Sequence, residues 1–297
     1  MKNILVKIAW ILAACTLPSM HAFSQATIQQ LLSNGPTDKR INIVFLSEGY
    51  TSAEMSKYIN TDVLIMLNQF TGTFPFAEYA TYFNAFAISV ESAESGSDHP
   101  SLGIDRNTFF SSTYETAGIT RLLTLQGIGY WRVDSLLQLL MPEYDIVVVI
   151  VNDTQYGGSG GSIAVTSINS AAPEIVMHEL GHSFGWLADE YEDATPGYVG
   201  SETPNTTAET DRNFIKWRTW IANTTPIPTP ETAEYSGVVG LFEGASYERI
   251  GWFRPKLNCK MRTLGIMYCE VCSEDLVESA YRFLRPIESF SPAQPAL

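Results

Sequence analysis

The sequence has few histidines, few cysteines and few basic residues. Its 297 residues include four His and four Cys, and 18 Lys and Arg stand against 32 Asp and Glu, which gives a formal net charge of -14 at pH 7. So acidic a chain is a poor partner for nucleic acid or for an anionic membrane surface. We find no internal repeat, no low-complexity block, and no transmembrane segment. The hydrophobic content of 45% is enough for one sizeable core.

The N-terminus, residues 1–24, has the pattern of a secretory signal peptide. Two lysines precede an apolar run at 8–17 that is too short to span a bilayer as a mature helix, and cleavage is expected after residue 24. The residues up to Cys15 also resemble a bacterial lipobox, in which Cys15 would become a lipidated first residue and a lipid anchor. Both alternatives predict an exported protein that is secreted, periplasmic or attached to the outer surface. Residues 25–297 are expected to form a single catalytic domain and a monomer.

The stretch that carries most chemical information is H-E-x-x-H at residues 178–182. On an α-helix, residues i and i+4 lie on one face, so His178 and His182 can direct two ring nitrogens at one metal ion. Glu179 lies beside them and can take a proton from an attacking water and pass it to a leaving amine. A catalytic zinc uses three protein ligands and keeps a fourth position for water. The alternative is an amphipathic helix with ordinary histidines, but chance rarely produces this motif in a chain with four His.

A third metal ligand is expected soon after this helix. Asp189 is the preferred residue, Glu190 is the alternative, and His99 or a distant carboxylate is a further option. With Glu192 and Asp193, the two acidic residues would crowd four negative charges into a short segment, and a nearby divalent cation would relieve this crowding.

The order of apolar and polar segments predicts an α/β fold. Strands are expected at 40–46, 82–90 and 145–151, and the last is an unbroken run typical of a strand buried on both faces. A helix capped by Thr51 or Ser52 is expected to reach about Phe70. The other expected elements are helices near 117–125 and 133–140, the helix that Pro173 opens, a hairpin or wall within 237–247, and a closing helix at about 274–283.

A glycine-rich stretch, Y-G-G-S-G-G at 156–161, lacks both the G-K-[ST] motif and a following helix that a phosphate site would need. It predicts a tight loop that leads into an edge strand at 162–166. Such an edge beside a metal site could pair with an extended peptide by β-augmentation. The residues nominated as the substrate edge are Gly160, Gly161, Ser162 and Ile163.

Three cysteines lie close together near the C-terminus. In an exported protein one disulfide is expected, and it could join Cys259 to either Cys269 or Cys272. The three cysteines could instead hold a structural metal, although the C-x-x-C spacing alone is not decisive.

Four motifs spread over the chain match one known family. They are K-R-I-N-I-V-F-L-S-E-G-Y at 39–50, Y-G-G-S-G-G at 156–161, H-E-L-G-H-S-F at 178–184 with D-E-Y at 189–191, and C-K-M-R at 259–262. Together they resemble the bacterial IgA-peptidase family of zinc metallopeptidases, which belongs to the metzincin-like clan. The resemblance implies an upper lobe, about 25–185, with a twisted, mostly parallel sheet and the active-site helix. It also implies a smaller, irregular lower lobe at about 186–297.

The same resemblance implies Zn²⁺ at His178, His182 and Asp189, with Glu179 as the general base. Metzincins place a methionine in a tight turn under the metal, and Met261 is preferred for this role over Met267. The alternative is that both methionines only fill gaps in the core. The chain departs from the better-known metzincin pattern because Ala188 stands where a third histidine ligand would fall.

The predicted function is that of a secreted zinc-dependent endopeptidase, with host or environmental proteins such as immunoglobulin A as substrates. Thr263 stands where some metzincins carry a tyrosine that stabilises the oxyanion, so Tyr191 and Tyr268 are weaker candidates for that role. Two other classes are considered: a zinc amidase that acts on cell-wall peptides, and a catalytically silent metal-binding surface protein. The intact Glu179 argues against the silent protein.

Overall fold

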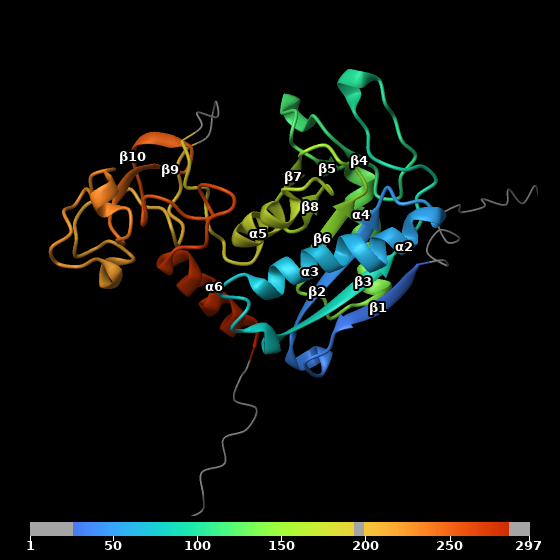
Figure 1. Cartoon of the computed structure of the whole chain (residues 1–297), viewed down its shortest axis with the longest axis horizontal. Helices are drawn as coiled ribbons and strands as arrows, with labels where there is room; N and C mark the ends of the chain where they lie inside the picture. The colour runs from blue at the N-terminus through green and yellow to red at the C-terminus, as the bar shows by residue number, and fades with distance from the viewer. Residues whose placement is uncertain (1–25, 193–198, 285–297) are drawn as a thin grey trace, which may run out of the picture.

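The computed structural model describes residues 26–192 and 199–284 (Figure 1). The expected signal peptide and Cys15 lie outside these residues. In the part of the chain that is described, no helix has the length and apolar character needed to cross a membrane.

A six-stranded, mostly parallel sheet forms the centre of the fold (Figure 1). Four neighbouring strands, β3, β2, β6 and β8, run parallel, while the outer strands β1 and β7 are antiparallel to β3 and β8. The predicted α/β class with a mostly parallel sheet is confirmed. In sheet order the strands are β1 (Thr27–Leu32), β3 (Phe83–Ser89), β2 (Ile41–Glu48), β6 (Ile146–Val151), β8 (Ala164–Thr166) and β7 (Gly158–Ser159).

Helices cover both faces of this sheet. Alternate residues of a strand point to opposite faces, so Phe45 and Val148 belong to one apolar core while Leu46 and Val149 belong to a second. The first core contains residues of α3 (Val63–Gly72) and α5 (Ala172–Ser183), which lie side by side (Figure 1). The second contains residues of α4 (Gly127–Leu140). As predicted, β6 is buried on both faces.

The helix predicted from Thr51 or Ser52 to about Phe70 is a helical run from Ser52 to Gly72 in which the type of turn changes. A capping box formed by Thr51 and Glu54 starts it, because each residue's side chain bonds to the other's backbone. A 3₁₀ turn (Ser52–Glu54) leads through α2 (Met55–Lys57) into a π-helical turn (Tyr58–Asp62) and then α3.

The helix predicted near 117–125 was wrong. That segment holds a 3₁₀ turn (Thr116–Gly118) and β5 (Thr124–Leu125), which pairs with β4 (Ser112–Thr113). Ala117 and Gly118 adopt φ values of +54° and +77°, a left-handed conformation that a right-handed helix cannot continue through. The helix predicted at 133–140 starts earlier, since α4 begins at Gly127.

The C-terminal part has little regular structure and packs beside α5 (Figure 1). Its hairpin joins β9 (Phe242–Ala245) to β10 (Glu248–Arg254), and its closing helix is α6 (Glu270–Phe283), which starts four residues before the predicted position. Trp217 and Leu276 of this part belong to the same apolar cluster as Phe45 of the sheet. One core therefore holds the sheet and the C-terminal part together.

Candidate metal centre

Helix α5 presents the H-E-x-x-H residues from a fixed orientation. Pro173 lies in its first turn, where a missing N–H costs nothing. Val176 and Leu180 on one side of the helix are buried in the core against the sheet. This burial fixes the rotation of α5, so that His178 and His182 face away from the sheet and stay partly exposed.

The chain bends sharply after α5. A Cβ atom built on Gly185 would lie 2.8 Å from a methyl group of Leu276 and 3.0 Å from the carbonyl oxygen of Gly181, so the close packing favours glycine here. Trp186 follows with a φ of +52°, which reverses the direction of the chain. This bend brings Asp189 back against the two histidines.

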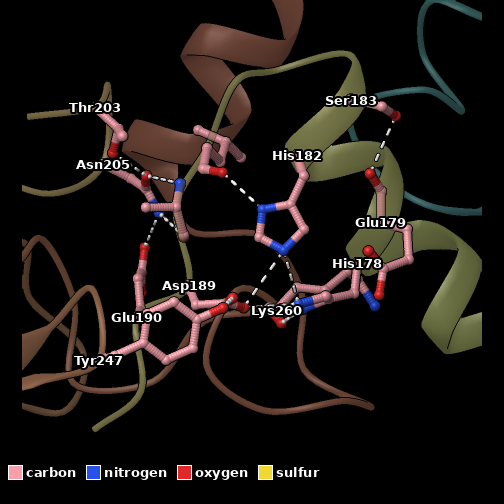
Figure 2. Close-up of polar contacts among 12 residues, drawn as sticks. His178, Glu179, His182, Ser183, Asp189, Glu190, Thr203, Asn205, Tyr247 and Lys260 are labelled. Carbon is pink, nitrogen blue, oxygen red and sulfur yellow. Dashed lines mark hydrogen bonds and ion pairs between the residues drawn. The ribbon is translucent and has the colours of Figure 1, made fainter. Parts of the chain in front are cut away.

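Three side-chain atoms converge at one point (Figure 2). The Nε2 atoms of His178 and His182 lie 3.2 Å apart, and Oδ1 of Asp189 lies 2.9 Å from the first and 3.4 Å from the second. Ligands bound about 2.0–2.1 Å from a tetrahedral ion lie roughly 3.3 Å from one another. The spacing of the three atoms therefore fits a zinc-sized ion with one position left open.

The protonation of both histidines also fits a metal site. Nδ1 of His178 donates to the carbonyl oxygen of Lys260 at 3.0 Å, and Nδ1 of His182 donates to that of Leu187 at 2.7 Å. Because a carbonyl oxygen only accepts, each Nδ1 carries a proton, so each ring in its neutral form directs the lone pair of its Nε2 at the shared point. Two lone pairs and a carboxylate oxygen would repel one another there unless a cation or a proton lay between them.

The pKa shifts of Asp189 and His182 also indicate a site that holds a cation or a proton. Burial alone would raise the pKa of Asp189, but hydrogen bonds from His178 and His182 hold it well below its usual range. Burial alone would lower the pKa of His182, whereas the hydrogen bond and charge of Asp189 raise it to about 9. A proton thus occupies the cluster when a metal does not, and metal binding must displace it.

Tyr247 is a residue of this site that the sequence did not reveal. Its hydroxyl donates to Oδ2 of Asp189, the oxygen that faces away from the histidines (Figure 2). Tyr247 lies in the turn between β9 and β10, where it and Ser246 adopt φ values of +64° and +55°. The hairpin or wall predicted within 237–247 ended at this tyrosine, and that was the one sign in the sequence that Tyr247 could lie near the site.

The two tyrosines considered for the oxyanion lie in different places. The ring of Tyr191 packs against that of Tyr247 with centroids 5.3 Å apart, beside the metal ligands. Tyr268 is buried and its hydroxyl donates to the carbonyl oxygen of Met177 inside the core, so it does not face the site.

The carboxylate of Glu179 lies next to the metal ligands and against the turn that follows β7. Burial raises its pKa, and the positive charges of His178 and His182 partly oppose this shift. A Cβ atom built on Gly160 would lie 2.3 Å from Oε2 of Glu179. Only a glycine therefore lets the turn come this close to the carboxylate.

The substrate edge predicted at Gly160, Gly161, Ser162 and Ile163 is not a strand. These residues form the turn between β7 and β8, and Gly161 adopts a φ of +125° that extended strands do not use. β8 lies between β6 and β7, so β7 forms this edge of the sheet. The turn is nevertheless exposed from 160 to 162 and borders the metal ligands through its contact with Glu179.

Met261, the preferred candidate for a methionine turn, packs directly against α5. It is fully buried, and a Cβ atom on Gly181 of α5 would come within 2.4 Å of its sulfur. The backbone around it forms a tight turn, in which Arg262 and Thr263 both donate to the carbonyl oxygen of Cys259 at 2.9 Å. Met267, the second methionine considered, is 64% exposed.

Both alternatives for the third ligand lie elsewhere. Glu190 turns its carboxylate away from the histidines and accepts a hydrogen bond of 2.9 Å from Asn205 (Figure 2). His99 is buried, bonds to Asp153 at 2.8 Å and stacks on Tyr114. The structure therefore brings only Asp189 of the three together with His178 and His182.

The expected disulfide is not formed. Cys259, Cys269 and Cys272 are all thiols, and the sulfur atoms of Cys259 and Cys272 lie 3.6 Å apart, against about 2.05 Å in a disulfide.

Comparison with known proteins agrees with this site. No curated protein matched the chain. A family model described as IgA Peptidase M64 matches residues 29–235 and 231–279, which include α5, Asp189 and the turn with Met261. Members of this family are metallopeptidases, that is, hydrolases acting on peptide bonds with a metal cofactor. Because the match covers most of the chain and contains the whole metal centre, the protein belongs to the IgA-peptidase family.

Proposed function

We propose that this metallopeptidase is an exported, zinc-dependent endopeptidase that cuts inside protein chains, with immunoglobulin A among the proteins to test first. The observation that carries the proposal is the convergence of two histidine Nε2 atoms and one Asp189 oxygen beside the carboxylate of Glu179. The signal-like residues 1–24 support export, and the description of the family supports immunoglobulin A as a substrate.

His178, His182 and Asp189 would hold the ion. The donor set of two neutral imidazoles and one carboxylate is one that catalytic zinc sites use. When bound, zinc supplies a Lewis acid that polarises the scissile carbonyl group and lowers the pKa of a water molecule.

The residues of the chain transfer the proton and hold the metal ligands in position. The carboxylate of Glu179 takes a proton from the attacking water at one oxygen and gives it to the amine that leaves. Partial burial suits this role, because it raises the pKa of Glu179 toward the pH at which a group both accepts and releases a proton. The carbonyl oxygens of Lys260 and Leu187 hold the two imidazoles in place, and Tyr247 holds Asp189.

We also propose a metzincin-like arrangement, with the sheet and α5 above the site and the irregular C-terminal part below it. The buried Met261, which touches α5 at Gly181 within a tight turn, supports this arrangement. The exposed turn at 160–162 is the proposed contact for the backbone of the substrate, since it borders Glu179.

The test is to replace Glu179 by Gln, which keeps the shape of the side chain but cannot accept the proton. We expect cleavage of an unfolded protein and of immunoglobulin A to fall by about 10²- to 10⁴-fold while the zinc content stays unchanged. Glu78→Gln, the same change at an exposed glutamate that is not part of the metal centre, serves as the control and should cleave as the unmodified protein does.

Full activity of Glu179→Gln would contradict the assignment of the general base. Cleavage of cell-wall peptides but of neither protein would show a zinc amidase instead of an endopeptidase. A zinc-loaded protein that cuts none of these substrates would favour the catalytically silent surface protein.

A further inference from the structure

A second group of metal-ligating side chains lies behind the first. The three cysteines and Glu190 place one ligand atom each within 4.8 Å of one another, and all four residues are buried. Glu190 is the neighbour of Asp189 in the sequence, and Cys259 lies two residues before Met261. Cys269 and Cys272 lie at the start of α6.

The distances within the group fit a tetrahedral ion. Thiolates bound about 2.3 Å from a tetrahedral zinc lie roughly 3.8 Å apart, and a thiolate and a carboxylate oxygen lie roughly 3.5 Å apart. The sulfur atoms of Cys259 and Cys272 lie 3.6 Å apart, and the sulfur of Cys272 lies 3.3 Å from Oε1 of Glu190. A disulfide would use two of the three cysteines and leave a thiol and a buried carboxylate with no role.

Glu190 supplies an independent sign that a ligand is missing. Its side chain is fully buried, and within the described residues its Oε2 atom has no hydrogen-bond partner. Asn205 donates only to the other oxygen, Oε1, at 2.9 Å. A buried carboxylate oxygen without a partner costs free energy unless a cation or a donor meets it, and the carboxylate that carries this oxygen belongs to the cluster.

Groups that stabilise negative charge border the cluster. Cys269 is the N-cap residue of α6 and Cys272 lies in its first turn, where the helix dipole and the free backbone N–H groups favour negative charge. The guanidinium of Arg262 donates to the carbonyl oxygen of Glu190 at 2.7 Å, which places a positive charge beside Glu190.

We propose that Cys259, Cys269, Cys272 and Glu190 bind a second divalent ion, a structural zinc with no position left for water. Three soft sulfur ligands and one oxygen select zinc over calcium or magnesium, which prefer oxygen. Four protein ligands close the site, as in structural zinc sites, whereas the centre at His178 has three and stays open.

The second ion would also position the first. The backbone N–H of Glu190 donates to the carbonyl oxygen of Met261 at 2.8 Å, and the carbonyl oxygen of Lys260 accepts from His178. An ion held by Glu190 and Cys259 would therefore fix two neighbouring segments. One carries Asp189, and the other carries the carbonyl group that accepts from His178.

The experiment counts metal ions per chain by mass spectrometry in protein purified with zinc. We expect two zinc ions in the unmodified protein, one in His182→Ala, and one in Cys272→Ser. Ser273→Ala, a change at a buried neighbour that offers no metal ligand, is the matched control and should keep two. If the centre at His178 did not bind zinc, the unmodified protein and His182→Ala would each hold one ion, and Cys272→Ser would hold none. Failure of the proposed function would therefore give a different result from failure of this proposal.

A second measurement needs no cysteine variant and covers the case in which Cys272→Ser does not fold. X-ray absorption of zinc in His182→Ala should show sulfur ligands at about 2.3 Å, and cobalt substitution should give thiolate-to-metal charge-transfer bands. The proposal would be overturned by zinc with only nitrogen and oxygen ligands. It would equally be overturned by a disulfide in the mass of the unreduced protein.

Discussion

Gly160 and Glu179 approach each other closely at the turn between β7 and β8. The atom that a side chain at position 160 would meet first is Oε2 of Glu179, at 2.3 Å from an ideal Cβ. That oxygen is the end of a flexible side chain, so the fold can adapt at low cost, but only by moving the carboxylate away from its place beside the metal ligands. Position 160 therefore affects the general base more than it affects stability.

Gly160→Ala is expected to lower kcat/KM by about 10- to 100-fold, because displacement of a reacting group by about 1 Å has an effect of this size. The zinc content and the melting temperature should stay close to those of the unmodified protein, since residue 160 is exposed. Gly72→Ala, the same substitution at a glycine with open space around it, is the control and should keep full activity. Normal kcat/KM in Gly160→Ala would show that Glu179 does not need its observed position.

Asp189 and Glu190 mark the limit of what the sequence predicts about single residues. The spacing of H-E-x-x-H was enough to predict His178, Glu179 and His182 as neighbours in one site. The two acidic residues offer the same chemistry, and the sequence could only rank them. Their directions depend on long-range contacts, since Tyr247 holds the first carboxylate and Asn205 the second.

At the scale of elements, a buried ion pair joins α5 to the turn that carries Met261. The ammonium group of Lys260 bonds to Oε2 of Glu174, with side-chain exposures of 3% and 29%. Glu174 also accepts from the side chain of Gln69 at 2.6 Å and from the backbone N–H of Gly265 at 3.0 Å. The pair therefore fixes the first turn of the helix against the C-terminal part, and with it the distance between His178 and its carbonyl partner.

Glu174→Gln is expected to destabilise the protein by about 3 kcal/mol, because it leaves the ammonium of Lys260 buried without a charge partner. Lys260→Met should cost less, about 1 kcal/mol, since Glu174 keeps two other donors and some contact with water. Urea unfolding measures both. Arg106→Met, which breaks an ion pair with Glu94 whose side chains are 43% and 46% exposed, is the control and should change stability by about 1 kcal/mol or less. Equal losses for Glu174→Gln and the control would contradict the role of the buried pair.

The sign of the pH dependence of this pair follows from Glu174. Burial raises its pKa, but the hydrogen bond from Lys260 and its other partners lower it below the ordinary value on balance. A carboxyl group with a lowered pKa stabilises the folded state above its unfolded pKa and loses this contribution as the pH falls through the folded pKa. The difference in stability between the unmodified protein and Glu174→Gln should therefore shrink in acid.

Helices and strands were predicted well where the apolar pattern was strong. They were predicted poorly where a glycine could mean either the end of a helix or close packing within one. The unbroken apolar run of β6 and the mostly apolar sequence of β2 determine two central strands from local sequence alone. The start of α4 was missed because Gly127 and Gly129 look like helix breakers. Gly129 is instead a packing residue, since a Cβ atom there would lie 1.8 Å from the carbonyl oxygen of Phe110. No local pattern reports such a contact.

At the scale of the whole molecule, the ligands of the first cluster are close in sequence, whereas those of the second come from distant parts of the chain. The ligands of the first come from α5 and from Asp189 after it, and those of the second from Glu190, Cys259 and the start of α6. The first ion would therefore tie α5 to the segment that follows it, and the second would cross-link Glu190 with Cys259 and α6 inside the C-terminal part, in addition to the core that this part shares with the sheet. An ion that binds the folded state but not the unfolded state raises the free energy of unfolding. This gain grows with the logarithm of the ratio of the metal concentration to Kd.

Removal of metal should therefore lower the Tm in two separable steps. An ion present at 100 times its Kd stabilises the folded state by about 2.7 kcal/mol, which corresponds to a shift of roughly 5–10 °C for a chain of this size. A strong chelator should lower the Tm of the unmodified protein by the sum of two such shifts, and that of His182→Ala by one. Added zinc should restore the Tm in both, and added magnesium in neither. A chelator that left the Tm of His182→Ala unchanged would show that the first centre alone contributes to stability. The thiolate cluster would then make no contribution to the stability of the folded chain.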